Sequence, residues 1–283
     1  MRIQVLGLCR FSMLASGDFQ TTGTDLAANR RILYDDHRMS RRMTWFENLC
    51  LPPLIWQQDQ NFTLVVATGL DLPEPWIGRL RAIAEAVPQI RLEQLSPDRQ
   101  AAMCREALSR HTDLSADVVA QFRMDDDDAV ALDYVRRVRA DFRLVERLLN
   151  PHHPVVVNYT NGLVAEWRHG GLRLHREMAP NWGLAQSFYF TGGTVRSAMN
   201  YRHDKVWAKV ATLSMPDRPM WIRGHHDVND SGGHLIGRNR LKAEDAEIDD
   251  ILGRRFGLDR AALAAALGEG SKAAAAQGQG RNG

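Results

Sequence analysis

Four consecutive aspartates, Asp125 to Asp128, are the residues whose type and spacing point most directly to chemistry in this 283-residue chain. They follow an apolar segment, residues 118–124, that has the composition of a buried strand. Carboxylates this close repel one another, so a fold that gathers them needs a compensating cation. A hard divalent ion is usually held by one or two protein carboxylates, with phosphate oxygens and water as the other ligands. The cluster therefore predicts metal and phosphate chemistry. The simpler alternative is that one aspartate caps the helix that follows and the others interact favourably with its dipole.

A second polar cluster follows the short apolar segment 220–222. Residues 225–234 read His-His-Asp-Val-Asn-Asp-Ser-Gly-Gly-His. An imidazole ligand would suit Mn²⁺ at least as well as Mg²⁺, so either ion is the expected cofactor. The alternative is an ordinary polar loop, because the segment is rich in good turn formers.

The elements that must position these clusters alternate in the first half of the chain. Strands are predicted at 3–9, 62–68, 90–95 and 118–124, and helices at 39–50, 76–87, 98–110 and 131–149. Alternating strands and helices predict an α/β fold with a mostly parallel sheet covered by helices on both faces. Ligands in such sheets bind at the carboxyl ends of strands, where the four aspartates fall.

The pattern changes after Pro151. Short strands are predicted at 155–159, 163–167, 172–175, 188–190 and 220–222, a helix at 204–213, and terminal helices over 240–267 broken at Gly257. This half is therefore expected to be antiparallel or mixed. We divide a single domain into an α/β half at 1–150, a mixed half at 151–237, a helical extension at 238–270 and a disordered tail at 271–283.

Composition narrows the classes further. With 36 Lys and Arg against 34 Asp and Glu, the net charge of +2 argues against the broad basic face that nucleic-acid binding needs. Apolar runs are all too short to span a membrane, and residues 3–9 are short for a signal peptide, so we expect a cytoplasmic protein. The three cysteines form no CxxC pair and are expected to be reduced, buried thiols.

Several segments together resemble a known family. The first strand ends in Arg10-Phe11-Ser12, Arg-Arg-Met-Thr-Trp-Phe-Glu occupies 41–47, and Leu-Pro-Pro-Leu occupies 51–54 ahead of Gln57. This arrangement is similar to the family of bacterial glycosyltransferases described as putative rhamnosyltransferases. Within that family, Arg123 to Asp128 looks like the DxD signature of GT-A-type, sugar-nucleotide-dependent enzymes. Trp221 followed by His226, Asn229 and Ser231 looks like its C-terminal motif, and the resemblance covers most of residues 1–235.

The resemblance implies a GT-A-like, Rossmann-type mixed sheet and roles for the clustered residues. It implies that Asp125 contacts the ribose or the metal and that Asp127, supported by Asp128, ligates the metal bridging the diphosphate; the pair Asp126/Asp128 is the alternative register. It makes His226, or less favourably His225, the third protein ligand. Residues implied on the donor-nucleotide side are Arg10, Ser12, Arg123, Asp125 and Asp126. Residues 1–150 would bind the nucleotide sugar, and residues 151–237 would face the acceptor.

The implied activity is metal-dependent transfer of a sugar, named by the family as rhamnose, from a nucleotide-diphosphate donor to a glycan or glycolipid hydroxyl. An inverting enzyme would also need a base for the acceptor hydroxyl, for which Glu166, Asp204 and Asp227 are candidates, whereas a retaining enzyme would not. A lipid-linked acceptor would allow peripheral membrane contact. The alternatives are a metal-dependent phosphohydrolase or nuclease, and a non-catalytic protein that binds nucleotide sugars or glycans.

Two further features are expected to lie outside the site. Arg41 and Arg42 fall on a helix with an apolar opposite face and are expected to be solvent-exposed; the alternative is that they contact phosphate. Trp182, in the Asn-Trp-Gly segment before strand 188–190, is expected to belong to the core.

Overall fold

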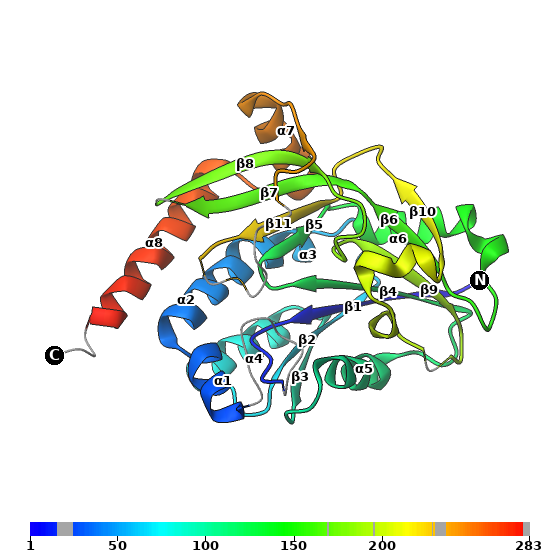
Figure 1. Cartoon of the computed structure of the whole chain (residues 1–283), viewed down its shortest axis with the longest axis horizontal. Helices are drawn as coiled ribbons and strands as arrows, with labels where there is room; N and C mark the ends of the chain where they lie inside the picture. Colours follow the sequence, from blue (N-terminus) through cyan, green and yellow to red (C-terminus); the bar gives the residue numbers. More distant parts are fainter. Residues whose placement is uncertain (16–24, 169, 195, 228, 230–235, 280–283) are drawn as a thin grey trace.

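A computed structural model describes residues 1–15, 25–168, 170–194, 196–227, 229 and 236–279 (Figure 1). It contains a seven-stranded sheet, a five-stranded sheet and helices that flank them. The predicted α/β class, a mixed sheet flanked by helices in a single domain, is confirmed. Strands from both halves of the chain share each sheet, because β4 lies beside β9 in the larger sheet and β5 beside β11 in the smaller one.

The larger sheet has the order β10-β6-β9-β4-β1-β2-β3. Its strands are β1 (Ile3–Arg10), β2 (Thr63–Gly69), β3 (Ile90–Leu95), β4 (Val118–Asp125), β6 (Val155–Tyr159), β9 (Gln186–Thr191) and β10 (Ala211–Met215). The first four are parallel, as predicted, whereas β9 runs antiparallel to both β4 and β6. The second half is therefore mixed, also as predicted.

The smaller sheet has the order β12-β8-β7-β11-β5 and lies above β1 and β4 in Figure 1. Its strands are β5 (Asp128–Val130), β7 (Asn161–Arg168), β8 (Gly171–Met178), β11 (Trp221–His225) and β12 (Arg240–Leu241). Since Asp125 ends β4 and Asp128 begins β5, the four aspartates form the crossing from one sheet to the other. The crossing brings them beside β11, the strand that leads into the histidine cluster.

The helices cover both faces of the larger sheet. They are α1 (Leu26–Leu33), α2 (Asp36–Trp45), a π-helical turn η1 (Phe46–Cys50), α3 (Leu51–Ile55), α4 (Trp76–Ala86), α5 (Gln100–His111), α6 (Tyr134–Asp141), α7 (Asp245–Phe256) and α8 (Arg260–Gln279). Short 3-10 helices are η2 (Phe142–Leu144), η3 (Glu146–Leu148), η4 (Ala198–Asn200) and η5 (His203–Ala208).

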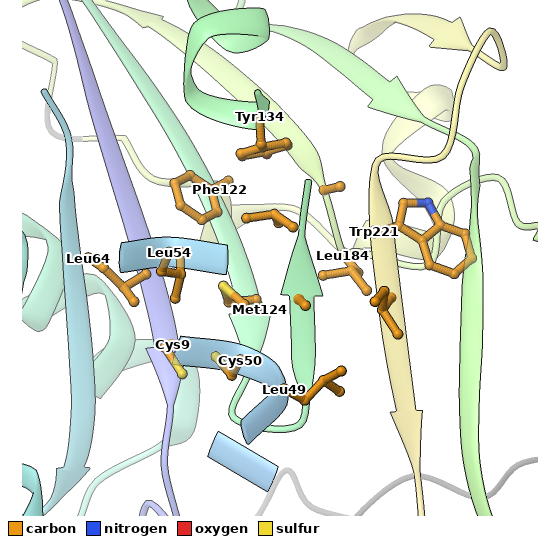
Figure 2. Close-up of a cluster of buried hydrophobic side chains, with 14 of the residues drawn as sticks. Cys9, Leu49, Cys50, Leu54, Leu64, Phe122, Met124, Tyr134, Leu184 and Trp221 are labelled. Carbon is orange, nitrogen blue, oxygen red and sulfur yellow. The ribbon is translucent and has the colours of Figure 1, made fainter. Parts of the chain in front are cut away.

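Side-chain alternation along β4 separates two buried layers. Phe122 and Met124 point into the main core. Figure 2 shows both side chains in this core, together with Leu54 of α3. Val119 faces the other side and packs in a second cluster with Met103 of α5. Residues i and i+2 of a strand share a face, so Arg123 and Asp125 lie on the α5 side with Val119. All three cysteines are free and buried, as expected.

Two predicted helices differ from the structure. The helix expected over 131–149 is shorter: residues 128–130 pair with β11, α6 begins at Tyr134, and the chain after Asp141 forms η2 and η3. The carbonyl of the Gln57 side chain accepts a hydrogen bond from Val135 N at 3.0 Å, which satisfies one of the free N–H groups at the start of α6. The helix expected over 204–213 is instead η5 followed by β10, because residues 211–215 pair in parallel with β6.

The C-terminal region is helical for longer than predicted. Gly257, in the left-handed conformation, ends α7 as expected, and its φ of 69° suits a residue without a side chain. Helix α8 then continues to Gln279, so the disordered tail predicted from residue 271 is not seen up to that point; residues 280–283 lie outside the described part. Within the described residues, the helices are all too short or too polar to cross a membrane.

Candidate functional site

Three of the four aspartates meet at the crossing from β4 to β5. Asp125, Asp127 and Asp128 each place one carboxylate oxygen within 4.8 Å of the others. Asp128 Oδ2 accepts a hydrogen bond from Asp125 N at 3.0 Å, which closes the turn and fixes the two residues relative to each other. Asp127 and Asp128 are buried, whereas the Asp125 side chain is 37% exposed. Three clustered carboxylates are a donor set that suits a hard divalent cation.

Asp126 points away from this group. Its side chain is fully buried and accepts two hydrogen bonds from Arg42, one of them from Nε at 2.8 Å. Burial raises the pKa of Asp126 to about 7, against the opposing effect of the guanidinium. Asp126 is therefore paired with Arg42 of α2. It does not lie with the other carboxylates on the expected donor-nucleotide side. The geometry favours the 125/127 register over the 126/128 alternative.

Arg41 and Arg42 are buried, so the expectation that they lie on the solvent-exposed surface is wrong. Arg41 contacts Asp227 at 2.9 Å, and Arg42 contacts Asp126. Their helical spacing correctly places them opposite the apolar face of α2, but that polar face lies against the aspartate turn and the loop after β11. A periodic pattern in the sequence cannot distinguish such a face from a solvated one.

His226 contacts Asp127 directly. Its Nε2 lies 3.2 Å from Asp127 Oδ2, and Asn229 donates a hydrogen bond to the same oxygen at 2.5 Å. The imidazole is buried against Trp45, with ring centroids 4.9 Å apart. Burial opposes ionisation of Asp127, but the hydrogen bond with His226 holds its pKa below the usual range. Among the described residues, the compact group of potential ligand atoms contains the three carboxylates and not His226, which is placed to orient Asp127.

Asp128 has the opposite electrostatic balance. Burial raises its pKa well above the ordinary value, and the charges of Asp127 and Asp125 raise it further. A cation beside Asp128 would relieve this repulsion.

Arginines surround the donor side of the cluster. Arg10 lies beside Asp125 in the β1–β4 register and donates to its Oδ1 from Nε at 2.8 Å and from Nη2 at 2.5 Å. Arg123 is held at the end of β4, and its Nη2 is buried with no hydrogen-bond partner among the described residues. Burial lowers the pKa of Arg123 to about 10, and the nearby Arg10 adds to the effect. Ser12 is different: its hydroxyl is buried and accepts a hydrogen bond from Arg38 at 2.9 Å.

The three candidate bases lie in different surroundings. Asp227 lines a cavity of about 430 Å³. Glu166, on β7, contacts Arg168 at 3.0 Å and lies 3.4 Å from Nδ1 of His225, which lines the same cavity. Asp204 is exposed on η5 and forms an ion pair with its neighbour Arg202. The cavity is lined by Arg41, Trp167, Arg168, Gly170, His225, His226 and Asp227. His226 lines this cavity and contacts Asp127, so the structure brings Asp227 and Glu166 beside the cavity, whereas Asp204 lies within electrostatic reach of Arg123 on the donor side.

The sequence did not single out Arg223, which lies next to the cluster. In the β5–β11 ladder it is the partner of Asp128. Its guanidinium lies over the ring of Trp182, 4.9 Å from the centroid, and Trp182 packs on Trp221 at 5.4 Å. Trp182 is therefore half-buried beside the site and not only a core residue. The spacing of Trp221 and Arg223 places both side chains on one strand face. Their contact with Trp182, which lies on a distant loop, is visible only in the three-dimensional structure.

Residues 4–238, most of the chain, match the family described as putative rhamnosyl transferase. The chain belongs to this family. Its expected signature residues Asp125, Asp127 and Asp128 are the three that the fold brings together. No curated protein sequence matches the chain.

Two solved structures are similar to the chain at low sequence identity. S. aureus TarS residues 1–349, in complex with UDP-GlcNAc, is 10% identical with a TM-score of 0.43, and the match covers 89% of this chain and 64% of that one. The mannosyltransferase PcManGT from Pyrobaculum calidifontis, in complex with GDP-Man and Mn²⁺, is 13% identical with a TM-score of 0.39, and the match covers 79% of this chain and 57% of that one. The chain thus spans less than two thirds of the length of either protein.

Proposed function

We propose that this protein transfers a sugar from a nucleoside-diphosphate sugar to a hydroxyl group of a glycan or glycolipid, with Mn²⁺ or Mg²⁺ as cofactor. The observation that carries the proposal is the group formed by Asp125, Asp127 and Asp128 at the carboxyl end of β4, in a member of a sugar-transferase family. Rhamnose is the donor sugar that the family description names.

The residues present fit a divalent cation. One oxygen from each of the three carboxylates is within reach of a common ligand, and the charges of Asp127 and Asp125 add to burial in raising the pKa of Asp128, a repulsion that a cation would relieve. A bound divalent ion would supply positive charge to the departing diphosphate. Asp127 is oriented for this role by His226 and Asn229, whereas Arg10 fixes Asp125.

The acceptor is proposed to bind in the cavity on the other side of His226. Two of the residues lining it, Asp227 and His225, are polar groups beside the cluster, and Trp167 adds an aromatic surface of the kind that sugars stack on. For an inverting transfer, the base that takes the proton of the acceptor hydroxyl must lie within hydrogen-bond reach of it. This requirement favours Asp227 and Glu166 over Asp204, whose contact is with Arg202.

The proposal is tested by thermal unfolding of the full chain with a panel of nucleotide sugars, with and without Mn²⁺, and by measuring donor hydrolysis and transfer. A donor at 100 times its dissociation constant stabilises a protein by about 2.7 kcal/mol. Asp127→Asn is expected to lose the Mn²⁺-dependent stabilisation and turnover. Asp249→Asn is the matched control and is expected to retain the stabilisation and the turnover. It removes a half-exposed carboxylate of α7 that is paired with Arg260 of α8.

Three outcomes would count against the proposal. Unchanged Mn²⁺-dependent donor binding and hydrolysis in Asp127→Asn would remove the site. Phosphate release from generic esters without a sugar acceptor would favour a phosphohydrolase or nuclease. Tight donor binding with no turnover on long incubation would favour a non-catalytic binding protein.

A further inference from the structure

Arg223 lies at the centre of the site, at the point where the two sheets meet. It is the β11 partner of Asp128, and its side chain shares a strand face with Trp221. The ring of Trp182 covers both side chains, with centroid distances of 4.9 Å to the Arg223 guanidinium and 5.4 Å to the Trp221 ring. Stacking on an indole fixes the plane of a guanidinium.

The charge of Arg223 acts on groups from several elements. In the aspartate turn it acts to lower the pKa values of Asp127 and Asp128. It has the same effect on the pKa values of His203 on η5 and His225 on β11. The half-buried guanidinium therefore lies among the carboxylates, the donor side and the residues lining the cavity.

Arg123 is the second arginine beside the loop that contains Trp182. Its buried Nη2 has no hydrogen-bond partner among the described residues, an arrangement that costs free energy unless a ligand supplies an acceptor. The same short loop contacts both arginines. Trp182 lies over Arg223, and a Cβ added to the next residue, Gly183, would lie 3.3 Å from Arg123 Nη2. Within this loop Asn181, Gly183 and Ala185 all have positive φ, so the loop has a specific, locally strained shape.

We propose that Arg223 and Arg123 form a clamp for the diphosphate of the donor, and that Trp182 is the residue that positions Arg223. This inference rests on the proposed function and adds to it a source of positive charge that belongs to the protein. Planar guanidinium groups bind phosphate oxygens through pairs of charge-assisted hydrogen bonds, which is the chemistry the clamp offers.

In the transfer step, the bond between the sugar carbon and the diphosphate oxygen breaks, and its electron pair goes to the diphosphate. The acceptor oxygen forms the new bond to the same carbon and gives its proton to the base. The clamp undergoes no covalent change; it stabilises the negative charge that accumulates on the leaving diphosphate.

The test measures binding of inorganic pyrophosphate to the full chain by calorimetry in the presence of EDTA. Arg223→Ala is expected to weaken binding about tenfold or more, the effect of losing hydrogen bonds between charged groups. Trp182→Ala is expected to weaken it less, about threefold, whereas Trp182→Phe keeps an aromatic face under the guanidinium and restores most of the affinity. Arg176→Ala is the matched control and leaves affinity unchanged. Arg176 lies on β8 of the same sheet as Arg223 and is paired with Glu247 of α7.

The clamp is refuted if wild-type protein binds no pyrophosphate in EDTA, if Arg223→Ala binds it with unchanged affinity, or if Trp182→Ala and Trp182→Phe are indistinguishable. Should Arg223→Ala fail to fold, Arg223→Lys and the two tryptophan variants carry the test. Failure of the two proposals can be told apart. Arg223-dependent pyrophosphate binding without turnover of any nucleotide sugar refutes only the proposed function. Asp127-dependent transfer with unchanged pyrophosphate binding in Arg223→Ala refutes only the clamp.

Discussion

Replacing Asp126 with asparagine tests which members of the aspartate run are structural. The Asp126 carboxylate is fully buried, and both of its oxygens accept hydrogen bonds from Arg42, whose side chain is 5% exposed. An asparagine keeps one acceptor but turns an NH₂ group toward an Arg42 donor and removes the counter-charge. Losing one partner of a buried ion pair costs about 3–5 kcal/mol, because the remaining charge stays buried without compensation. That is a large share of the roughly 5–15 kcal/mol by which domains are stable.

The measurement is the free energy of unfolding from urea titration at about pH 8.5, above the pKa of about 7 of Asp126, so that its carboxylate is charged; unfolding is followed by circular dichroism. Asp125→Asn is the matched control. It removes the same charge one residue away, but the Asp125 and Arg10 side chains are 37% and 29% exposed, and ion pairs with such exposure contribute about 0–1 kcal/mol. A double variant, Arg42→Met with Asp126→Leu, is expected to regain most of the stability, since apolar residues of similar size often replace a buried pair at little cost.

The reasoning fails if Asp126→Asn unfolds within about 1 kcal/mol of wild type, or if Asp125→Asn is equally destabilised. A second measurement separates structure from function. At a temperature where Asp126→Asn is folded, Mn²⁺ is expected to stabilise it as it does wild type, whereas Asp127→Asn is expected to show no such effect. Loss of Mn²⁺ stabilisation in Asp126→Asn alone would mean that the ligand register has been assigned wrongly.

Three other variants have defined outcomes. In Gly162→Ala the new Cβ would lie 2.2–2.5 Å from atoms of the Trp221 indole, so we expect a loss of about 1–3 kcal/mol in unfolding free energy and weaker pyrophosphate binding by calorimetry. Burial lowers the pKa of His203 to about 4, so the unfolded chain binds a proton more readily and stability is lost as pH falls from about 6.5 through 4; His203→Gln is expected to reduce that loss by about 1–3 kcal/mol in urea titrations across this range. Glu177→Gln removes a fully buried carboxylate that accepts a hydrogen bond from Gly237 N at 3.0 Å, and we expect about 1–3 kcal/mol of destabilisation with faster proteolysis near that residue.

The position of the four aspartates at the end of a strand could be predicted because it depends on local patterns. The apolar segment before Asp125 has the composition of a buried strand, and the end of a parallel strand is where ligands bind in this fold class. The aspartates follow directly from that strand in the sequence, so no long-range contact is needed to locate them. The same holds for the break at Gly257, where a glycine ends one helix and periodicity resumes after it.

Side-chain partners could not be predicted, because they come from distant parts of the chain. The helical pattern of α2 is compatible with both an exposed and a buried polar face, and only the aspartate turn decides that Arg42 is buried. The helix expected over 131–149 is present only over Tyr134–Asp141, because the chain just before it pairs with β11 at residues 128–130 and the chain after it forms two 3-10 turns. Arg223 was missed for the same reason: its importance lies in its position relative to Trp182 and Asp128.

The division of charge among the four aspartates indicates where a cation would bind. Arg42 neutralises Asp126 and Arg10 is paired with Asp125, so two of the four charges are already compensated by guanidinium groups from α2 and β1. Asp127 is held by His226 and Asn229, and the charges of Asp127 and Asp125 add to burial in raising the pKa of Asp128, so a cation beside this pair would relieve the repulsion. A cation is therefore expected mainly on the Asp127 and Asp128 side, where β5 meets β11. If the clamp is also correct, cation and diphosphate meet on that side, and removing Arg223 lowers affinity for pyrophosphate without lowering affinity for Mn²⁺ alone. Because a guanidinium repels a divalent ion, Mn²⁺ affinity in Arg223→Ala is expected to stay equal or rise.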